Sequence, residues 1–357
     1  MANSSLSAAS SAPGPAAQEP IRGWPAVTAW LVARIDLVLR LGLLGIIVIA
    51  VIFFTVSTIP QGQNLTQSIF ISGGNLQNVG RQMAVVGVIA IGETFVIITA
   101  GIDLSVGSLL GLCGVITALE FLAGWPTVLI VVSVLLFAMA VGLLNGFLVS
   151  AAKIPPFIVT LGMLGILRGT AYLLGNGLNS SLSVTGDPPP FSVWVGGTYL
   201  GVPTIFVVLA VIGVVATIFL RYTRRGRYIY ALGSNPESAR LVGINVRATV
   251  LTVYTISALL AGVAGLLLTG RLNGANPNNG LSYELDAISA AVLGGASLFG
   301  AKGTIFGTFL GVVLINVLAN GIDLINVEPH MQQVIEGFLL ILIVWVDQWR
   351  KRRVVAA

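Results

Sequence analysis

Long apolar runs separated by short polar turns make up most of this chain. The first run extends from about residue 37 to residue 57, and similar runs recur until about residue 346. Each run has close to the roughly 20 residues that an α-helix needs to cross a lipid bilayer. The pattern therefore predicts an all-α fold, a polytopic helical bundle embedded in a membrane, with about ten transmembrane helices.

Glycine marks two places where this pattern is interrupted. Gly101 lies between two apolar runs, which indicates a broken-helix segment or a tight turn there, because glycine tolerates backbone turns that other residues resist. Farther along, the glycine-rich stretch 294–303 separates two more apolar runs, and we expect a full span on each side of it. At the start of the second of these spans, Gly303, Gly307 and Gly311 recur every four residues, a spacing that favours close packing of helices.

Charged residues are scarce and unevenly placed. They form 9% of the chain, against about 25% in an average soluble domain, as expected for an integral membrane protein. Lysine and arginine concentrate in turns such as 221–247 and 350–353, whereas the loop 58–78 carries no charge. Basic residues mark the cytoplasmic side of a membrane protein. Both termini are therefore expected in the cytoplasm, with residues 1–24 as a disordered cytoplasmic tail and 25–357 as one transmembrane domain.

The arginine-rich loop 221–247 contains the pattern of a short helix. Ser234 and Glu237 have the spacing of a capping box. Pro236 suits a first helical turn, and Gly243 suits the C-terminal end. A helix of about seven residues is marginal by itself in water, so it should dock on something, and we expect a partner protein. The alternative is an ordinary arginine-rich loop that lies on the bilayer or on its own bundle.

The residues of an enzymatic site are not recognisable in the sequence. The chain has a single cysteine, Cys113, and a single histidine, His330, and shows no metal-ligand spacing. Gly295 and Gly300 have the spacing that opens a phosphate-binding loop, but Ala301 stands where that loop needs lysine. We therefore expect no enzyme, no metal site and no cofactor. The net charge of +5 comes from residues at span ends, so nucleic acid is not an expected partner.

Polar residues inside or beside the apolar runs are better candidates for function. Ionisable groups in a bilayer are expensive and usually face a cavity or one another. The alternative is that they only connect helices through hydrogen bonds. They are too few and too scattered for a proton relay. The candidates for a translocation pathway are Glu93, Asp103, Ser105, Asn145, Asn316 and Asn320.

Four stretches of the chain together resemble one family. They are GIDLSVGS from Gly101, GRYIYALGSNPESARLVGINV from Gly226, YELDAISAAVLGGASLFGAKG from Tyr283, and the following span up to Gly321. Their order and spacing cover most of residues 75–347. In these stretches the chain resembles the permease subunits of bacterial ABC importers for monosaccharides, of the ribose, xylose and arabinose type, and ribose permeases above all.

The resemblance implies a set of partners. Two permease subunits, expected as a homodimer, would form one pathway through the bacterial inner membrane. Cytoplasmic ATPase subunits would supply energy, and a periplasmic sugar-binding protein would deliver the sugar. The family's coupling helix, which contacts the ATPase, corresponds here to Asn235, Glu237, Ala239, Arg240, Leu241, Val242 and Gly243. Asp103 and Ser105 match the family's motif that begins at Gly101.

Two other functions remain open from the sequence. One is a secondary transporter or channel that needs no ATPase and would require a proton or sodium site within its spans. The other is an ABC permease of the same architecture for a different small solute, such as a branched-chain amino acid.

Overall fold

The computed structural model describes residues 35–61, 64–175, 180–182 and 187–328, and beyond these only residues 331, 334, 335, 337, 338, 341 and 345. The chain divides into two units after Val38, and everything below concerns the second unit, Leu39–Ala357. The expected tail 1–24, the basic segment 350–353 and His330 lie outside the described residues.

Helices form nearly all of the described structure. The long helices are α2 (Ile35–Ser57), α3 (Gly73–Ile98), α4 (Val106–Leu122), α5 (Thr127–Ser150), α6 (Pro156–Leu174), α8 (Thr204–Tyr222), α11 (Val246–Leu272) and α13 (Ile305–Leu324). The shorter ones are the 3₁₀ turn η1 (Leu65–Gln67), α7 (Pro190–Gly196), α9 (Arg224–Ser234), α10 (Pro236–Leu241) and α12 (Tyr283–Leu293). Two-residue strands pair antiparallel, β1 (Ser180–Ser181) with β4 (Gly274–Ala275) and β2 (Thr198–Tyr199) with β3 (Val202–Pro203).

The length and hydropathy of these helices confirm a polytopic membrane bundle. Among the described residues, 6 helices are long and apolar enough to cross a membrane, namely α3, α5, α6, α8, α11 and α13. Shorter apolar helices cover Leu41–Ser57 in α2 and Val106–Leu122 in α4.

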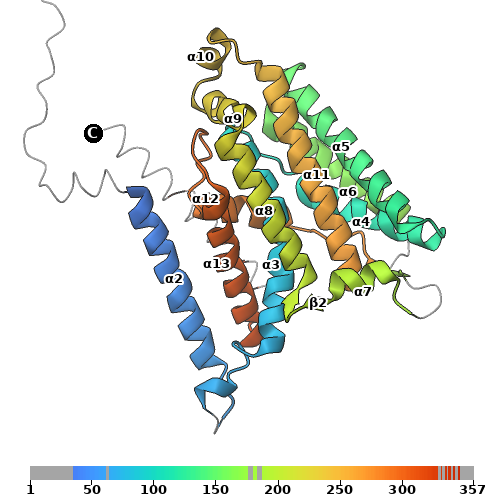
Figure 1. Ribbon diagram of the computed structural model, residues 1–357, viewed down its shortest axis with the longest axis vertical. Coiled ribbons are helices and arrows are strands. Elements are labelled where there is room, and N and C mark those ends of the chain that lie inside the picture. Colours follow the sequence, from blue (N-terminus) through green and yellow to red (C-terminus); the bar gives the residue numbers. More distant parts are fainter. Residues whose placement is uncertain are drawn as a thin grey trace, which may run out of the picture. The chain divides into compact units, whose positions relative to one another are not determined.

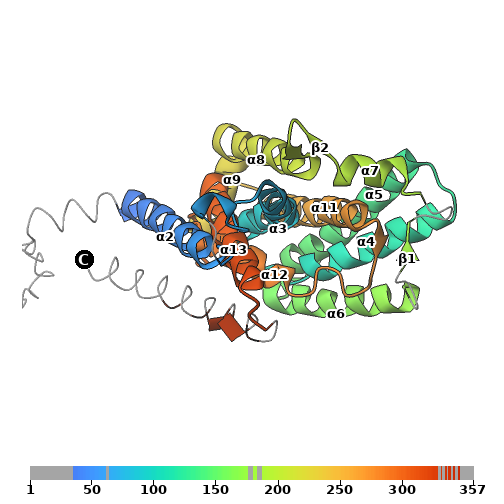
Figure 2. The same ribbon diagram turned by 90° about the horizontal axis from the view of Figure 1, so that it is seen from below.

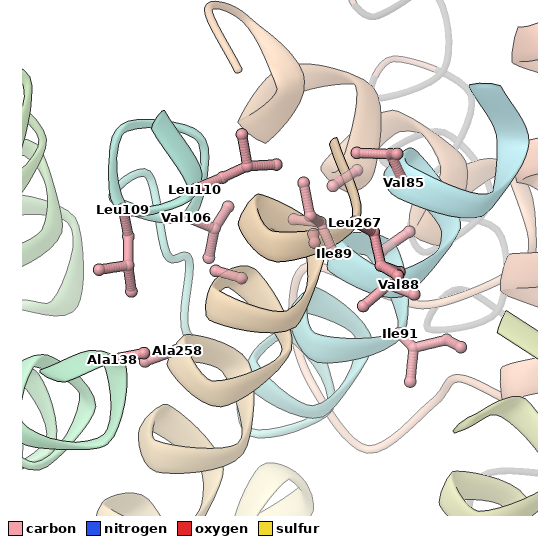
Figure 3. Close-up of a cluster of buried hydrophobic side chains, with 14 of the residues drawn as sticks. Val85, Val88, Ile89, Ile91, Val106, Leu109, Leu110, Ala138, Ala258 and Leu267 are labelled. Atoms are coloured by element: carbon pink, nitrogen blue, oxygen red, sulfur yellow. The ribbon is translucent and has the colours of Figure 1, made fainter. Parts of the chain in front are cut away.

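Helix α3 lies in the middle of the bundle and α8 at its edge. In the most apolar window of α3, 89% of the residues are buried within the protein, against 22% in α8. The end-on view shows α3 between α8, α11 and α13 (Figure 2). Side chains of α3 such as Val88 and Ile89 form the core together with Leu110 of α4 and Leu267 of α11 (Figure 3). The outer helices leave apolar faces uncovered, which suits contact with lipid.

Helices α9 and α10 lie at one end of the bundle, and α7 lies at the other (Figure 1). We call these the α10 end and the α7 end. The α10 end also holds the C-terminal end of α3 and the loop 294–304, because the Ala301 amide donates a hydrogen bond to the carbonyl oxygen of Ile98 at 2.9 Å.

The interruption expected near Gly101 lies between α3 and α4, over residues 99–105. Its turn differs from the expected one. The residue in the left-handed conformation is Ala100, with φ 60°, and not Gly101. Gly101 is required for another reason: an added Cβ would lie 2.8 Å from the Tyr254 hydroxyl and 3.0 Å from Val96. The glycine therefore allows close approach of side chains from α3 and α11.

The full span expected before the stretch 294–303 is wrong. Helix α12 there has only 11 residues, about 16 Å of helix, or half of a hydrocarbon core about 30 Å thick. The non-helical segment 273–282 precedes it and lies along α4. An added Cβ at Gly111 or at Gly107 would come within 2.5 Å of the carbonyl oxygens of Asn279 and Gly280, respectively. The sequence pattern did not predict this position of residues 273–282, because their polar, glycine-rich composition is typical of an ordinary turn after α11.

Glycines bring α12 and α13 into close contact. Of the three glycines spaced four residues apart, Gly307 and Gly311 lie on α13 and form this contact. An added Cβ at Gly307 would overlap the carbonyl oxygen of Gly294, and one at Gly311 would overlap that of Ala290. Gly303 is different, because α13 begins only at Ile305, after its N-cap Thr304. Gly303 lies in the preceding loop with φ 154°.

The short helix in the arginine-rich loop begins one residue later than its capping box predicted. Asn235, not Ser234, is the N-cap of α10, and its Oδ1 accepts hydrogen bonds from the amides of Glu237 and Ser238 at 2.9 and 3.0 Å. Ser234 instead ends α9, a helix of 11 residues that the sequence analysis did not foresee. Gly243 ends the element with φ 83°, as expected of a C-terminal glycine.

Candidate functional site

Four of the six pathway candidates meet at the interruption between α3 and α4. Glu93 comes from α3, Asp103 and Ser105 from the segment 99–105, and Asn145 from α5, and each is at most 1% exposed. Ser257 of α11 completes this group, which we call the break cluster.

Hydrogen bonds run through the break cluster from helix to helix. The Asp103 amide donates to Glu93 Oε1 at 3.1 Å. Asp103 Oδ1 accepts from the amide and the hydroxyl of Ser105 at 3.0 and 2.6 Å, and Oδ2 accepts from the Ser257 hydroxyl at 3.2 Å. Asn145 Nδ2 donates to Ser105 Oγ at 3.1 Å. The cluster therefore ties α3, α5 and α11 to one non-helical segment.

Three polar atoms in and beside the break cluster are buried without a hydrogen-bond partner among the described residues. They are Glu93 Oε2, Asn145 Oδ1 and the Tyr254 hydroxyl, the last of which adjoins Gly101. Buried polar groups without partners are rare and costly, and in a bilayer such groups usually mark functional positions. The cluster thus holds unused hydrogen-bonding capacity at the point where two helices are joined.

The other two pathway candidates lie elsewhere. Asn320 of α13 exchanges two side-chain hydrogen bonds with Asn75 of α3, at 2.8 and 3.0 Å. Asn316 donates to the carbonyl oxygen of Val312 in its own helix at 2.9 Å. Both side chains are buried against protein, so the structure does not bring them to the break cluster.

A second set of polar residues fixes the segment 273–282. Arg168 of α6 donates hydrogen bonds to the carbonyl oxygens of Pro277 and Asn279, the latter at 3.0 Å. Glu284, in the first turn of α12, lies against Gly107, and its Oε2 is buried without a partner among the described residues. Non-helical backbone within a membrane protein occurs where protein or a cavity surrounds it.

Sequence reasoning missed several of these residues. Ser257 and Tyr254 occur singly in an apolar run, where nothing in the pattern separates them from core residues. Glu284 could have been predicted as a candidate, because it is an acidic residue at the start of an apolar run.

The C-terminal end of α10 presents two apolar side chains to the outside of the protein, one from its last residue and one from its C-cap. Leu241 is 83% exposed and Val242 is 77% exposed. Ala239 was expected at the same surface, but it is 3% exposed and packs inside the chain. Glu237 and Arg240 are exposed beside the two apolar residues.

Residues suited to hold a metal are not grouped together in the described part of the chain, where no three His, Cys, Asp or Glu side chains form a suitable set.

Comparison with known proteins places this arrangement in a family. Residues 75–344 match the family described as branched-chain amino acid transport system, permease component. The chain is 38% identical over 321 residues to the ribose import permease protein RbsC of Escherichia coli K12, covering 89% of this chain and 94% of that protein. It is 38% identical to RbsC of Haemophilus influenzae over 78% of this chain and 87% of that protein.

A third relative is the xylose transport system permease protein XylH of E. coli K12, 35% identical over 81% of this chain and 88% of that protein. No solved structure matches the chain. A permease component is a transport subunit and not an enzyme. On the extent of the match over residues 75–344 and its identity to these relatives, this chain belongs to the family of transport-system permease components.

Proposed function

We propose that this chain is the permease subunit of an ATP-driven importer that carries a monosaccharide across the bacterial inner membrane. The relatives named for ribose and xylose support a pentose as the substrate, and the similarity is higher to the ribose permeases. The family description, which names branched-chain amino acids, keeps a different small solute as the alternative.

We propose about ten membrane crossings, with both termini in the cytoplasm. The crossings are the eight long helices, the discontinuous segment 273–293, and the apolar segment around residues 331–345. An even number returns the chain to its starting side. The arginines of the loop 221–247 then assign the α10 end to the cytoplasm.

The observation that carries the coupling proposal is the exposure of Leu241, the last residue of α10, and of its C-cap Val242. Two large apolar side chains exposed at a polar, arginine-rich end favour a partner protein that covers them and removes them from water. An ATPase subunit on the cytoplasmic side is the proposed partner. A second permease subunit and a periplasmic sugar-binding protein complete the proposed complex.

The break cluster is proposed to flank the pathway and to set the angle between α3 and α4. Because Glu93, Asp103, Ser105 and Asn145 are buried in this conformation, they would act on transport through the position of these helices. For Asn316 and Asn320, the contacts within and between helices favour a structural role beside the pathway.

Substitution of Leu241 by aspartate tests the coupling proposal. The side chain is 83% exposed, so Leu241→Asp should leave the permease folded and inserted. A buried aspartate without a partner would weaken an ATPase interface by several kcal/mol. We expect uptake of ribose to be lost, and the ATPase either to dissociate on purification or to hydrolyse ATP independently of the sugar-loaded binding protein.

Leu200 provides the matched control, because it is 89% exposed and lies beyond β2, at the α7 end. Leu200→Asp introduces the same charge and should leave the ATPase bound. Full ribose uptake by Leu241→Asp with the ATPase still bound would refute coupling through α10. Ribose uptake without any ATPase would favour a secondary transporter instead.

A further inference from the structure

A cavity of about 440 Å³ is lined by residues of the last turns of α8, of helix α9 and of the beginning of α13. Figures 1 and 2 show where these three helices lie in the bundle. Its lining includes Arg221 of α8, Arg227 of α9 and Phe306 of α13. Neither the break cluster nor α10 contributes to this lining. The cavity is therefore separate from both parts of the proposed transport machinery.

The cavity has a one-sided charge. Arg221 and Arg227 supply two guanidinium groups, and none of the described lining residues is acidic. The Arg221 guanidinium carbon lies 5.6 Å from the centre of the Tyr222 ring, a cation–π contact that orients it without neutralising it. Two guanidinium groups beside one cavity, without a carboxylate in its lining, favour an anion.

The beginning of α13 adds backbone donors to the same cavity. Thr304 is the N-cap, and its hydroxyl accepts a hydrogen bond from the Gly307 amide at 3.1 Å. By helix geometry, the amides of Ile305 and Phe306 have no partner within α13. Both residues line the cavity, so the positive end of the helix dipole reinforces the two arginines there.

Apolar surface continues from this cavity along the outside of the bundle. Phe306 is 58% exposed, and Ile218, in the last turns of α8, is 51% exposed. Val211, Val214 and Ile218 are exposed and precede the lining residue Arg221 by ten, seven and three residues, so the helical repeat places them on the same side of α8 as Arg221. An anion bound at Arg221 would therefore lie at one end of an apolar helix face suited to acyl chains, which a free anion does not need.

We propose that this cavity binds the phosphate of an anionic phospholipid, with the acyl chains on the exposed face of α8. The proposal rests on the assignment of the α10 end to the cytoplasm, where the membrane leaflet carries anionic lipid. Free phosphate shares the binding chemistry, but only a lipid also uses the apolar surface of α8.

Native mass spectrometry of the purified full-length permease tests this proposal without any ATPase. The probes are dioleoylphosphatidylglycerol, which is anionic, and dioleoylphosphatidylcholine, whose phosphate is balanced by the positive charge of choline. We expect the phosphatidylglycerol to bind with an affinity about tenfold or more above that of the phosphatidylcholine, and Arg221→Ala/Arg227→Ala to remove this difference.

Arg224→Ala/Arg225→Ala is the matched control, because both arginines are exposed on α9 and neither lines the cavity. This variant should keep the preference for phosphatidylglycerol within about twofold of the parent protein. An equal loss of the preference for phosphatidylglycerol in both double variants would mean that the arginines attract anionic lipid nonspecifically, and it would overturn the site.

Soluble phosphates separate the two sources of the anion. Inorganic phosphate or glycerol 3-phosphate that binds as tightly as the lipid would overturn the lipid and leave a site for soluble phosphate. A separate purification together with the ATPase gives a further outcome. If Arg221→Ala/Arg227→Ala binds lipid unchanged but no longer co-purifies with the ATPase, the lipid is overturned and the cavity is a contact for protein. The assay contains no ATPase, so its failure leaves the coupling proposal standing, and Leu241→Asp should bind lipid normally.

Discussion

Removal of the Asp103 carboxylate should loosen the junction between α3 and α4. That carboxylate accepts three hydrogen bonds, two from Ser105 and one from Ser257. The two bonds from Ser105 are local, and only the bond from Ser257 joins Asp103 to another helix, α11. A hydrogen bond between side chains in a membrane protein contributes about 0.6 kcal/mol on average and about 1.7 kcal/mol at most. Relief of the desolvation of the carboxylate offsets part of the loss. For Asp103→Ala we therefore expect a net cost of about 1 kcal/mol to the contact with α11.

The single cysteine of the chain provides the assay. Cys113 is 0% exposed in α4, two turns after the interruption, and a thiol reagent reaches it only when α4 separates from α11. If Asp103→Ala lowers the free energy of this opening by about 1 kcal/mol, a small maleimide should label Cys113 about fivefold faster. Asp103→Asn keeps an oxygen for Ser105 and should label at an intermediate rate.

Asn316→Ala serves as the control, because its one described bond lies within α13. That variant should label Cys113 at the parent rate. If Asp103→Ala also labels Cys113 at the parent rate, the hydrogen bonds of the break cluster do not hold α4 against α11.

Two further predictions concern helix packing and topology. Gly311→Val should prevent folding of the permease in the membrane, because even a Cβ at this position overlaps the carbonyl oxygen of Ala290. Gly162→Val should fold normally, because a Cβ there meets nothing within 4 Å. Gel filtration in detergent should show a single folded species for Gly162→Val and aggregated protein for Gly311→Val. A cysteine at Asn278 should react with an impermeant thiol reagent from outside the cell if the segment 273–282 opens to that side, and one at Ser238 only after the membrane is permeabilised. Labelling of Ser238→Cys from outside would reverse the proposed orientation.

The sequence predicted the bundle well where one rule sufficed. Apolar runs of span length became helices such as α5 and α8, because backbone hydrogen bonds in a bilayer must be made within the segment. The sequence also named Glu93, Asp103, Ser105 and Asn145 as pathway candidates, since polar residues stand out in apolar runs, and their role stays a prediction. It did not show that these four meet, because that depends on how α3, α5 and α11 pack.

The errors arose where two local signals competed. The stretch before Gly294 ends in apolar residues and was predicted as a span, but Glu284 and Asp286 stand in the first turn of α12, which has only 11 residues. The glycines of α4 leave room beside them for the non-helical backbone that precedes α12. Ser234 and Asn235 are both good N-caps, and only the path of α9 decides between them. At α10 all three of Ala239, Leu241 and Val242 are apolar, so hydrophobicity alone does not predict which of them faces outward. The structure shows Leu241 and Val242 exposed and Ala239 buried.

The non-helical segment 273–282 also restricts the order in which this protein is made. Its few internal turn hydrogen bonds, such as the one from the Asn279 amide to the carbonyl oxygen of Asn276 at 2.9 Å, leave other backbone groups without a partner in the segment, so it is not stable in lipid by itself. The acidic residues at the start of α12 also oppose its insertion as a helix. The surface that accepts the segment belongs to α4 and α6, which leave the ribosome more than a hundred residues earlier. The C-terminal half therefore depends on the N-terminal half as a template during biogenesis, and a cell that synthesised the two halves in the opposite order would have no site for this segment to enter.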